Sequence, residues 1–292
     1  MANLKELRSR IKSVNSTLQI TSAMKMVSAA KLRQAQNAIT SFRPYSEKLK
    51  DLLNNLSDDT DISKNNVFFN REEENNILII LVTGNKGLCG AFNSNVIKKS
   101  KEQLDLFSSK KVDFLTIGKK GHNYIKKSKQ NLLEEANVLV DKASYNNNAE
   151  LADKIIESYV NKKYDKVLIC YNKFKNAANQ IAKVEQILPI KKETKKEKEN
   201  KTTTSIDYIF EPRKKELLSS IIPKTIKSQL HKSILDSIAA EHGARMTAMH
   251  KATDNATELN KDLKLSYNKA RQASITGEIL EIVGGAEALK NN

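Results

Sequence analysis

The sequence predicts an α/β protein with long helices, in which an antiparallel coiled coil of the N- and C-terminal segments accompanies a central α/β domain. Three observations lead to this fold class. Both ends of the 292-residue chain are nearly free of glycine and proline, and the central part alternates apolar runs with helical segments. In addition, an aromatic content of 5% without tryptophan leaves too little bulk for one large spherical core.

Residues 1–58 are predicted to form the N-terminal coiled-coil helix. Apolar side chains recur there with alternating spacings of three and four residues, as in a coiled-coil seam, at Leu4, Leu7, Ile11, Val14 and Leu18. The pattern then changes, because Met24, Met26 and Val27 put apolar groups on more than one helix face. We therefore expect this part of the helix to need more than one partner.

Residues 70–210 are predicted to form an α/β domain with a largely parallel sheet. Three runs are apolar enough for strands buried on both faces, at 77–82, 112–117 and 166–171. Helical patterns separate them, at about 93–107, 119–129 and 148–162. This alternation indicates a Rossmann-like arrangement. Residues 191–201 hold six lysines, three glutamates and no apolar residue, which predicts a solvated, disordered loop.

Residues 211–292 are predicted to form the C-terminal coiled-coil helix. Its seam has the same spacing with mostly small residues, at Ala252, Ala256, Leu259, Leu263, Ser266, Ala270, Ala273, Gly277 and Leu280. A helix from about 224 to 288 would be about 100 Å long, roughly twice the diameter of a compact globule of this chain length. We expect it to project from any globular body.

The pairing of the two helices predicts an unpaired tip. If both leave the central domain together and run antiparallel, paired residue numbers add to about 270, which puts Met24 opposite Met246. The last turns of the C-terminal helix then have no helical partner, although they carry Ile275, Ile279, Leu280, Ile282 and Val283. An exposed apolar tip indicates an interaction site, so we expect it to end inside a sleeve supplied by another protein.

Catalytic, metal and cofactor sites are not indicated. The loop 83–90 has glycines at 84, 87 and 90 and matches neither the phosphate loop GxxxxGK[ST] nor the dinucleotide motif GxGxxG, so we expect a tight turn that exposes Lys86. Cys89 and Cys170 lack the spacing of a zinc site or a disulfide framework. The residues by themselves therefore indicate no metal site and no cofactor motif.

The charge distribution indicates an acidic partner. The net charge is +16, and the stretch from Leu7 to Ser46 has seven basic residues and no acidic one. Few aromatic residues are available there to stack on bases, which favours a protein partner over a nucleic acid. A basic coiled-coil protein that binds nucleic acid is the main alternative, and a nucleotide-binding α/β enzyme with helical arms is the next.

Two segments are specific enough to indicate a family, Ile20–Leu32 (ITSAMKMVSAAKL) and Tyr267–Ile279 (YNKARQASITGEI). They resemble the gamma subunits of the F-type ATP synthase, and the likeness extends over essentially the whole chain. The resemblance implies a noncatalytic central-stalk rotor whose C-terminal tip is held in the α3β3 hexamer. Its α/β domain would lie near the epsilon subunit and the c-ring, and its rotation would couple proton flow to ATP synthesis in the β subunits. No cofactor, nucleic acid or small-molecule substrate is implied.

The same resemblance implies rotor–stator contacts at eight positions, namely Met24, Lys25, Arg245, Gln272, Thr276, Glu278, Lys86 and Cys89. The first three lie where acidic lever segments of β press on the shaft, the next three match positions that touch the β catch loops, and the last two lie in a turn that faces the same β domains. Tyr208 and Glu211 match the segment that meets the c-ring. Plainer roles stay open: Met24 as a core filler, Glu278 as a surface carboxylate, and Glu211 facing solvent.

Two departures from the family pattern limit the inference. Asn85 stands where the family usually has aspartate, which puts an ionic contact of that carboxylate in doubt. The lysine-rich run at 191–201 contains no cysteine, so the thiol switch of chloroplast relatives is not expected. With no transit peptide at the N-terminus either, the resemblance implies a bacterial protein, which we expect to be peripheral on the cytoplasmic face of the inner membrane.

Overall fold

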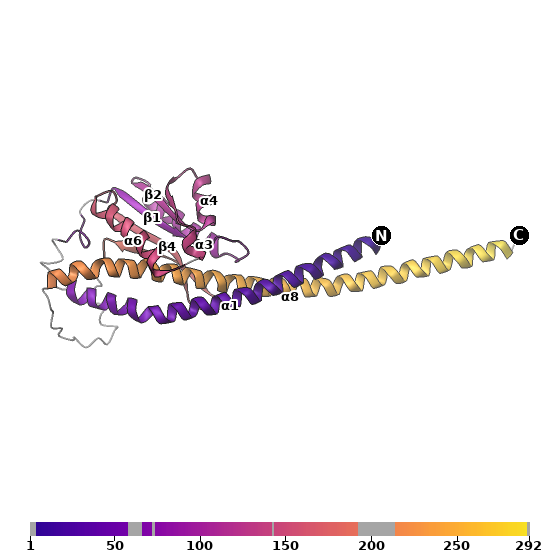
Figure 1. Cartoon of the computed structure of the whole chain (residues 1–292). Helices are drawn as coiled ribbons and strands as arrows, with labels where there is room; N and C mark the ends of the chain where they lie inside the picture. The colour runs from indigo at the N-terminus through magenta and orange to yellow at the C-terminus, as the bar shows by residue number, and fades with distance from the viewer. Residues whose placement is uncertain (1–3, 58–65, 72–73, 142, 192–213, 291–292) are drawn as a thin grey trace. The chain divides into compact units, whose positions relative to one another are not determined.

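The computed structural model describes residues 4–57, 66–71, 74–141, 143–191 and 214–290. Two long helices account for just over half of them: α1, Leu4–Ser57, and α8, Lys214–Lys290 (Figure 1). The chain divides into two compact units. Residues 29–245 form the sheet unit, and residues 1–28 with 246–292 form the coil unit. Both long helices contribute to each unit.

The sheet unit is built on five strands in the order β3-β2-β1-β4-β5. Their bounds are Asn76–Val82 for β1, Lys111–Ile117 for β2, Asn131–Glu135 for β3, Lys166–Phe174 for β4 and Gln180–Leu188 for β5. β1 pairs in parallel with β2 and β4, β2 pairs in parallel with β3, and only β5 is antiparallel to its neighbour. The expected parallel α/β sheet is therefore confirmed, with two strands that the apolar runs did not reveal.

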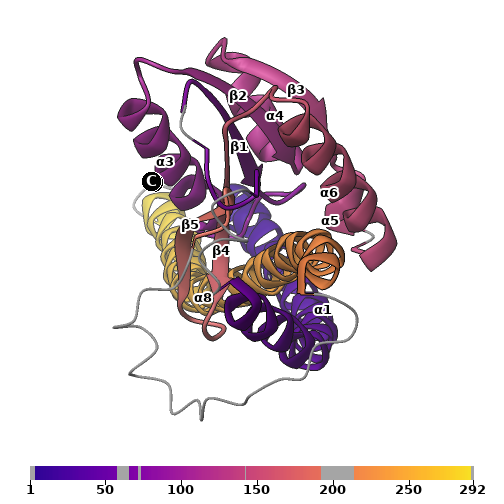
Figure 2. The same ribbon diagram turned by 90° about the vertical axis from the view of Figure 1, so that its left-hand side faces the viewer.

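Helices cover both faces of this sheet, which is why β1 is buried along almost its whole length. One face, with Ile77 and Ile79, packs against α3 (Phe92–Leu106) and α4 (Lys119–Lys127). The other face, with Leu78 and Ile80, packs against α6 (Tyr145–Val160), α1 and α8. A single turn, α5 (Val138–Asp141), precedes α6. Figure 2 shows α3 and α6 on different sides of the sheet.

The part of α8 within the sheet unit lies between the sheet and α1 and is buried on most sides. Small residues permit this close packing, and Ala239, Ala240 and Ala244 are among them. A buried polar joint links three helices here. The Asn148 amide of α6 lies 2.6 Å from Nδ1 of His231 of α8, whose ring packs edge-on against Phe42 of α1 and Tyr145. Burial lowers the pKa of His231 to about 4, so the ring is neutral at pH 7.

In the coil unit, α1 and α8 pair antiparallel, as expected, but in a different register. Thr253 donates to Thr21 across 2.9 Å, and Asn260 donates to Asn15 across 2.6 Å. The paired residue numbers thus add to 274 and 275 instead of about 270, a difference of about one helical turn. The expected register assumed that both helices leave the central domain at the same level. The observed register is instead defined by polar pairs between the two helices, Thr21 with Thr253 and Asn15 with Asn260. In this register the residue of α8 opposite Met24 is His250 and not Met246.

Several sequence expectations fall outside the described residues. They include most of the lysine-rich segment 191–201 and both residues proposed to face the c-ring, Tyr208 and Glu211. Within the described part of the chain, no helix is both long enough and apolar enough to span a lipid bilayer.

Candidate functional site

The strand order places a potential ligand crevice between β1 and β4. The chain goes from β1 outward to β2 and β3 and then returns to the other side of β1 with β4, and open α/β sheets bind ligands where the order reverses in this way. The loop after β1, residues 83–90, borders this position. In this chain α8 occupies it: a Cβ atom on Gly84 would lie only 2.7 Å from Cδ of Glu241. Glycine at 84 thus permits the helix to approach the loop.

Arg245 ties the same loop to α8. Its guanidinium donates to the Glu241 carboxylate across 2.5 Å, to the carbonyl of Lys86 across 3.4 Å and to the carbonyl of Gly87 across 3.3 Å. Both Glu241 and Arg245 are buried. Since charge-assisted hydrogen bonds shielded from water are stronger than neutral ones, this pair makes a firm joint between the β1 loop and the long helix.

Three backbone amides at this edge are already bonded to side chains. Gly84 donates to Asn93 across 2.9 Å, Gly118 donates to Asn137 across 3.1 Å, and Lys119 donates to Asn85 across 3.0 Å. Phosphate-binding loops instead direct such amides at the ligand. These three amides therefore hold the loops together and are not directed at a ligand.

Asn85 uses both ends of its amide at this joint. Its oxygen accepts the Lys119 amide hydrogen, and its nitrogen donates to the carbonyl of Asn137 across 3.2 Å. The side chain thereby links the loops that follow β1, β2 and β3. An ionised aspartate could accept the first bond but could not donate the second. The two bonds therefore explain why asparagine suits position 85 better than aspartate does.

Cys89 lies inside the joint. Its side chain is 1% exposed and packs with Phe92, Ala240 and Ala244, and Asn93 donates to its sulfur across 3.2 Å. Burial raises the pKa of the thiol against the opposing effect of the nearby Arg245 charge. The side chains that the turn exposes are Lys86 and Leu88, of which Leu88 is 64% exposed and has φ of 61°.

The structure therefore brings Lys86, Cys89 and Arg245 together around one joint of the sheet unit. Glu241 was not predicted as a site residue, although its position four residues before Arg245 on a helix is a recognisable ion-pair spacing. Leu88 was not predicted either. Among the described residues, no group of His, Cys, Asp and Glu side chains is arranged to hold a metal ion.

The other five residues expected at rotor–stator contacts lie in the coil unit. Met24 and Lys25 are half-buried on α1, beside a patch of exposed apolar side chains formed by Ile20, Met26 and Val27. Gln272, Thr276 and Glu278 are exposed near the end of α8. Glu278 accepts a hydrogen bond from Ser274 one turn earlier, across 3.3 Å.

The end of α8 is an apolar surface open to water. Its large side chains are between 47% and 71% exposed, at Ile275, Ile279, Leu280, Ile282 and Val283. In the observed register Leu4 lies near residue 270, so this tip extends beyond the described residues of α1. Burying such side chains stabilises an assembly by about 1.5–3 kcal/mol each, which makes the tip suited to enclosure by a partner.

Comparison with known proteins gives consistent matches over the whole chain. The family model described as ATP synthase matches residues 3–289. A protein of Flavobacterium johnsoniae named ATP synthase gamma chain is 54% identical over 289 residues, which are 99% of each chain. The protein of the same name from Christiangramia forsetii is 55% identical over 291 residues, again 99% of each chain.

Solved structures with the same fold come from mitochondrial ATP synthases. A chain of the Euglena gracilis enzyme, from a structure of its rotor, matches with a TM-score of 0.67 at 21% identity and covers 93% of this chain and 98% of its own. A chain from the central stalk and c-ring of the Tetrahymena thermophila enzyme matches with a TM-score of 0.57 at 24% identity, covering 80% of this chain and 99% of its own. These likenesses establish the fold.

Proposed function

The chain belongs to the ATP synthase gamma-chain family, and from this premise we propose that it is the noncatalytic rotor of the central stalk of an F-type ATP synthase. It turns within a hexamer of α and β subunits and couples proton flow to ATP synthesis at catalytic sites on β. The observation that carries the proposal is the family match over residues 3–289, together with an exposed apolar tip on α8 that suits enclosure.

The rotor acts by presenting different faces to three β subunits in turn. A rotor that binds each β conformation with different affinity shifts the conformational equilibrium of that subunit. We assign the contacts with β to two regions. One is the coil unit, with Met24, Lys25, Gln272, Thr276 and Glu278. The other is the joint around Arg245, where Lys86 offers an exposed charge and Cys89 holds the turn from within.

The sheet unit is the proposed foot of the rotor. We place the epsilon subunit and the c-ring there, with Tyr208 and Glu211 facing the ring. The protein is then a peripheral subunit on the cytoplasmic face of the bacterial inner membrane. Support comes from the bacterial gamma chains that are more than 50% identical to it and from the central-stalk and c-ring assembly of its structural relative.

The alternatives raised by the sequence are not supported. The family model, the relatives and the solved structures described above are those of ATP synthases and their gamma chains, which supports neither a nucleic-acid-binding protein nor a separate nucleotide-binding enzyme. Glu241, bonded to Arg245, also lies against Gly84 of the β1 loop, at the edge where an α/β enzyme of this topology would hold a nucleotide.

The apolar tip provides the first test. Ile279→Asp or Leu280→Asp should reduce the amount of α and β subunits that copurify with the tagged chain, because enclosure would desolvate an ionised carboxylate. Leu106→Asp is the matched control, since Leu106 is similarly exposed but lies on α3 of the sheet unit. Retention of α and β equal to that of the control would contradict the sleeve around the tip.

A further inference from the structure

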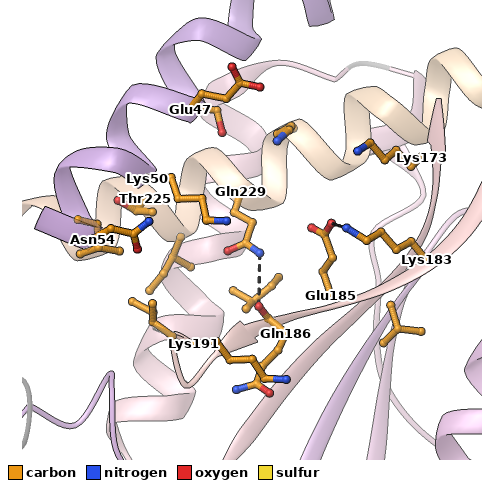
Figure 3. Close-up of a pocket in the computed structure, with 17 residues that line it drawn as sticks. Glu47, Lys50, Asn54, Lys173, Lys183, Glu185, Gln186, Lys191, Thr225 and Gln229 are labelled. Atoms are coloured by element: carbon orange, nitrogen blue, oxygen red, sulfur yellow. Dashed lines mark hydrogen bonds and ion pairs between the residues drawn. The ribbon is translucent and has the colours of Figure 1, made fainter. Parts of the chain in front are cut away.

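A pocket of about 490 Å³ lies in the sheet unit between α1, β5 and α8, and no step of the rotor mechanism uses it. Seventeen residues line it, from Ser46 on α1 to Lys232 on α8 (Figure 3). None of them belongs to the joint around Arg245. Its volume is within the range of small-molecule sites in proteins. The pocket is therefore large enough for a ligand the size of a nucleotide.

Positive charge dominates the lining. Five lysines contribute, from α1, β4, β5, α8 and the segment after β5: Lys50, Lys173, Lys183, Lys232 and Lys191. Two glutamates oppose them, Glu47 and Glu185. Glu185 is bonded to Lys183 across 2.5 Å, and although burial acts to raise its pKa, the bonds with Lys183 and Tyr171 lower it on balance. The lining thus keeps a cationic excess, which favours an anion.

The floor of the pocket is apolar. Leu53, Ile187 and Ile226 belong to the core and are almost fully buried, and Val184 and Ile190 lie beside them. Polar side chains stand between floor and rim, including Gln229, which donates to the carbonyl of Gln186 across 3.4 Å. Figure 3 shows Lys50, Gln229 and Glu185 directed toward the same space. An apolar floor under a cationic rim suits a molecule that has an anionic group on an apolar body.

We propose that this pocket binds an organic phosphate, with the phosphate group held by the lysines and the apolar body on the floor formed by Leu53, Ile187 and Ile226. Phosphate is the best match among anions, because a multivalent group can bond with several ammonium groups at once. A bound ligand would contact α1, β5 and α8 together and brace the sheet unit. Because the ligand would bind the folded chain and not the unfolded one, it would also raise the free energy of unfolding.

Binding to the isolated full-length chain is the test, measured by titration calorimetry with ATP, inorganic triphosphate and adenosine. We expect ATP to bind more tightly than triphosphate, and adenosine to bind most weakly, since only ATP engages both rim and floor. Lys50→Gln with Lys191→Gln should weaken ATP binding at least tenfold. Lys126→Gln with Lys127→Gln removes the same charge from exposed positions on α4 and should change the affinity less than twofold.

A second arm identifies the source of the phosphate. Dihexanoyl phosphatidate, a water-soluble lipid, is titrated in parallel with ATP. Tighter binding of ATP would support a soluble ligand, and tighter binding of phosphatidate would support a lipid headgroup. If neither binds, or if the control pair weakens binding as much as the pocket pair, the proposal is wrong. These assays use no other subunit, so their outcome is independent of the rotor function.

Discussion

At the residue scale, the contact between the β1 loop and α8 depends on the absence of a side chain at Gly84. Glu241 cannot easily move aside, because it is buried and bonded to Arg245. Gly84→Ala should therefore lower the free energy of unfolding by about 1–3 kcal/mol, the usual cost of overpacking. Urea denaturation of the isolated chain measures it.

Gly277→Ala is the matched control for this substitution. Gly277 is helical and has no atom near the position of an added Cβ, so alanine should leave stability unchanged or raise it by about 0.5–1 kcal/mol. A Gly84→Ala chain as stable as wild type would mean that the loop and α8 are not in close contact.

Asn85 supports a second residue-scale prediction. Asn85→Asp keeps the size of the side chain but removes the 3.2 Å bond to the carbonyl of Asn137, leaving that carbonyl with the longer 3.4 Å bond from the Val140 amide. We expect a loss of about 0.5–1.5 kcal/mol in the free energy of unfolding near pH 7, measured by the same denaturation. Asn176→Asp is a suitable control, because this exposed asparagine uses its side-chain oxygen as an acceptor from Ala178 and Asn179. Equal stability of the two variants would contradict the bridging role.

At the element scale, His231 joins α1, α6 and α8 in its neutral form. Its pKa in the folded chain, about 4, is below the ordinary histidine value near 6.5, so the unfolded chain binds the proton more readily. Stability should therefore fall as the pH drops from about 6.5 to about 4, by about 3 kcal/mol for this group. His242 has a pKa of about 4 as well, through burial and the charges of Arg245 and Lys31, and adds to the slope.

Denaturation of wild type and His231→Gln between pH 7 and pH 4.5 checks this expectation. Glutamine should lower stability at pH 7, because it loses the contacts with Phe42 and Tyr145, but it should also flatten the pH dependence. His250→Gln serves as the control, since His250 is exposed and pairs with Asp254 one turn away on the same helix. If His231→Gln left the pH dependence of the free energy of unfolding unchanged, His231 would not be a group that takes up a proton on unfolding.

Elements with a strong local pattern could be predicted from the sequence. The apolar run of β1 and the two glycine-poor ends indicated the central strand and the long helices within a few residues. β3 was missed because it is short and lies at an edge of the sheet, and β5 because its side chains are only partly buried. The coil register differed by about one turn, since specific pairs such as Thr21 with Thr253 set it and spacing alone does not reveal them.

The candidate site was predictable to a lesser degree. Motif likeness placed Lys86, Cys89 and Arg245 in two distant segments, and the fold brings them to one joint. The burial of Cys89 and the role of Glu241 depend on how α8 packs against the β1 loop, which is a tertiary contact without a local sequence signal. The asparagine network around residue 85 has the same origin.

At the scale of the whole molecule, function follows from charge and surface more than from any catalytic group. The stretch from Leu7 to Ser46 is basic without a single carboxylate, and the end of α8 is apolar and exposed. In an isolated chain the like charges repel one another and the apolar side chains stay in contact with water. A partner with acidic and apolar surfaces would pair the charges and bury the apolar side chains. The chain is therefore suited to act mechanically, as one part of a larger assembly.

Rotation itself is the most direct test of this account. The native cysteines, Cys89 and Cys170, are both buried, so Lys126→Cys on the exposed side of α4 offers a selective site for an optical probe. In a complex assembled with α and β subunits and immobilised through β, ATP should turn the probe in one direction with three steps per revolution, one for each β subunit. A probe that stays fixed while the same complexes hydrolyse ATP would contradict the central claim that this chain is the rotor.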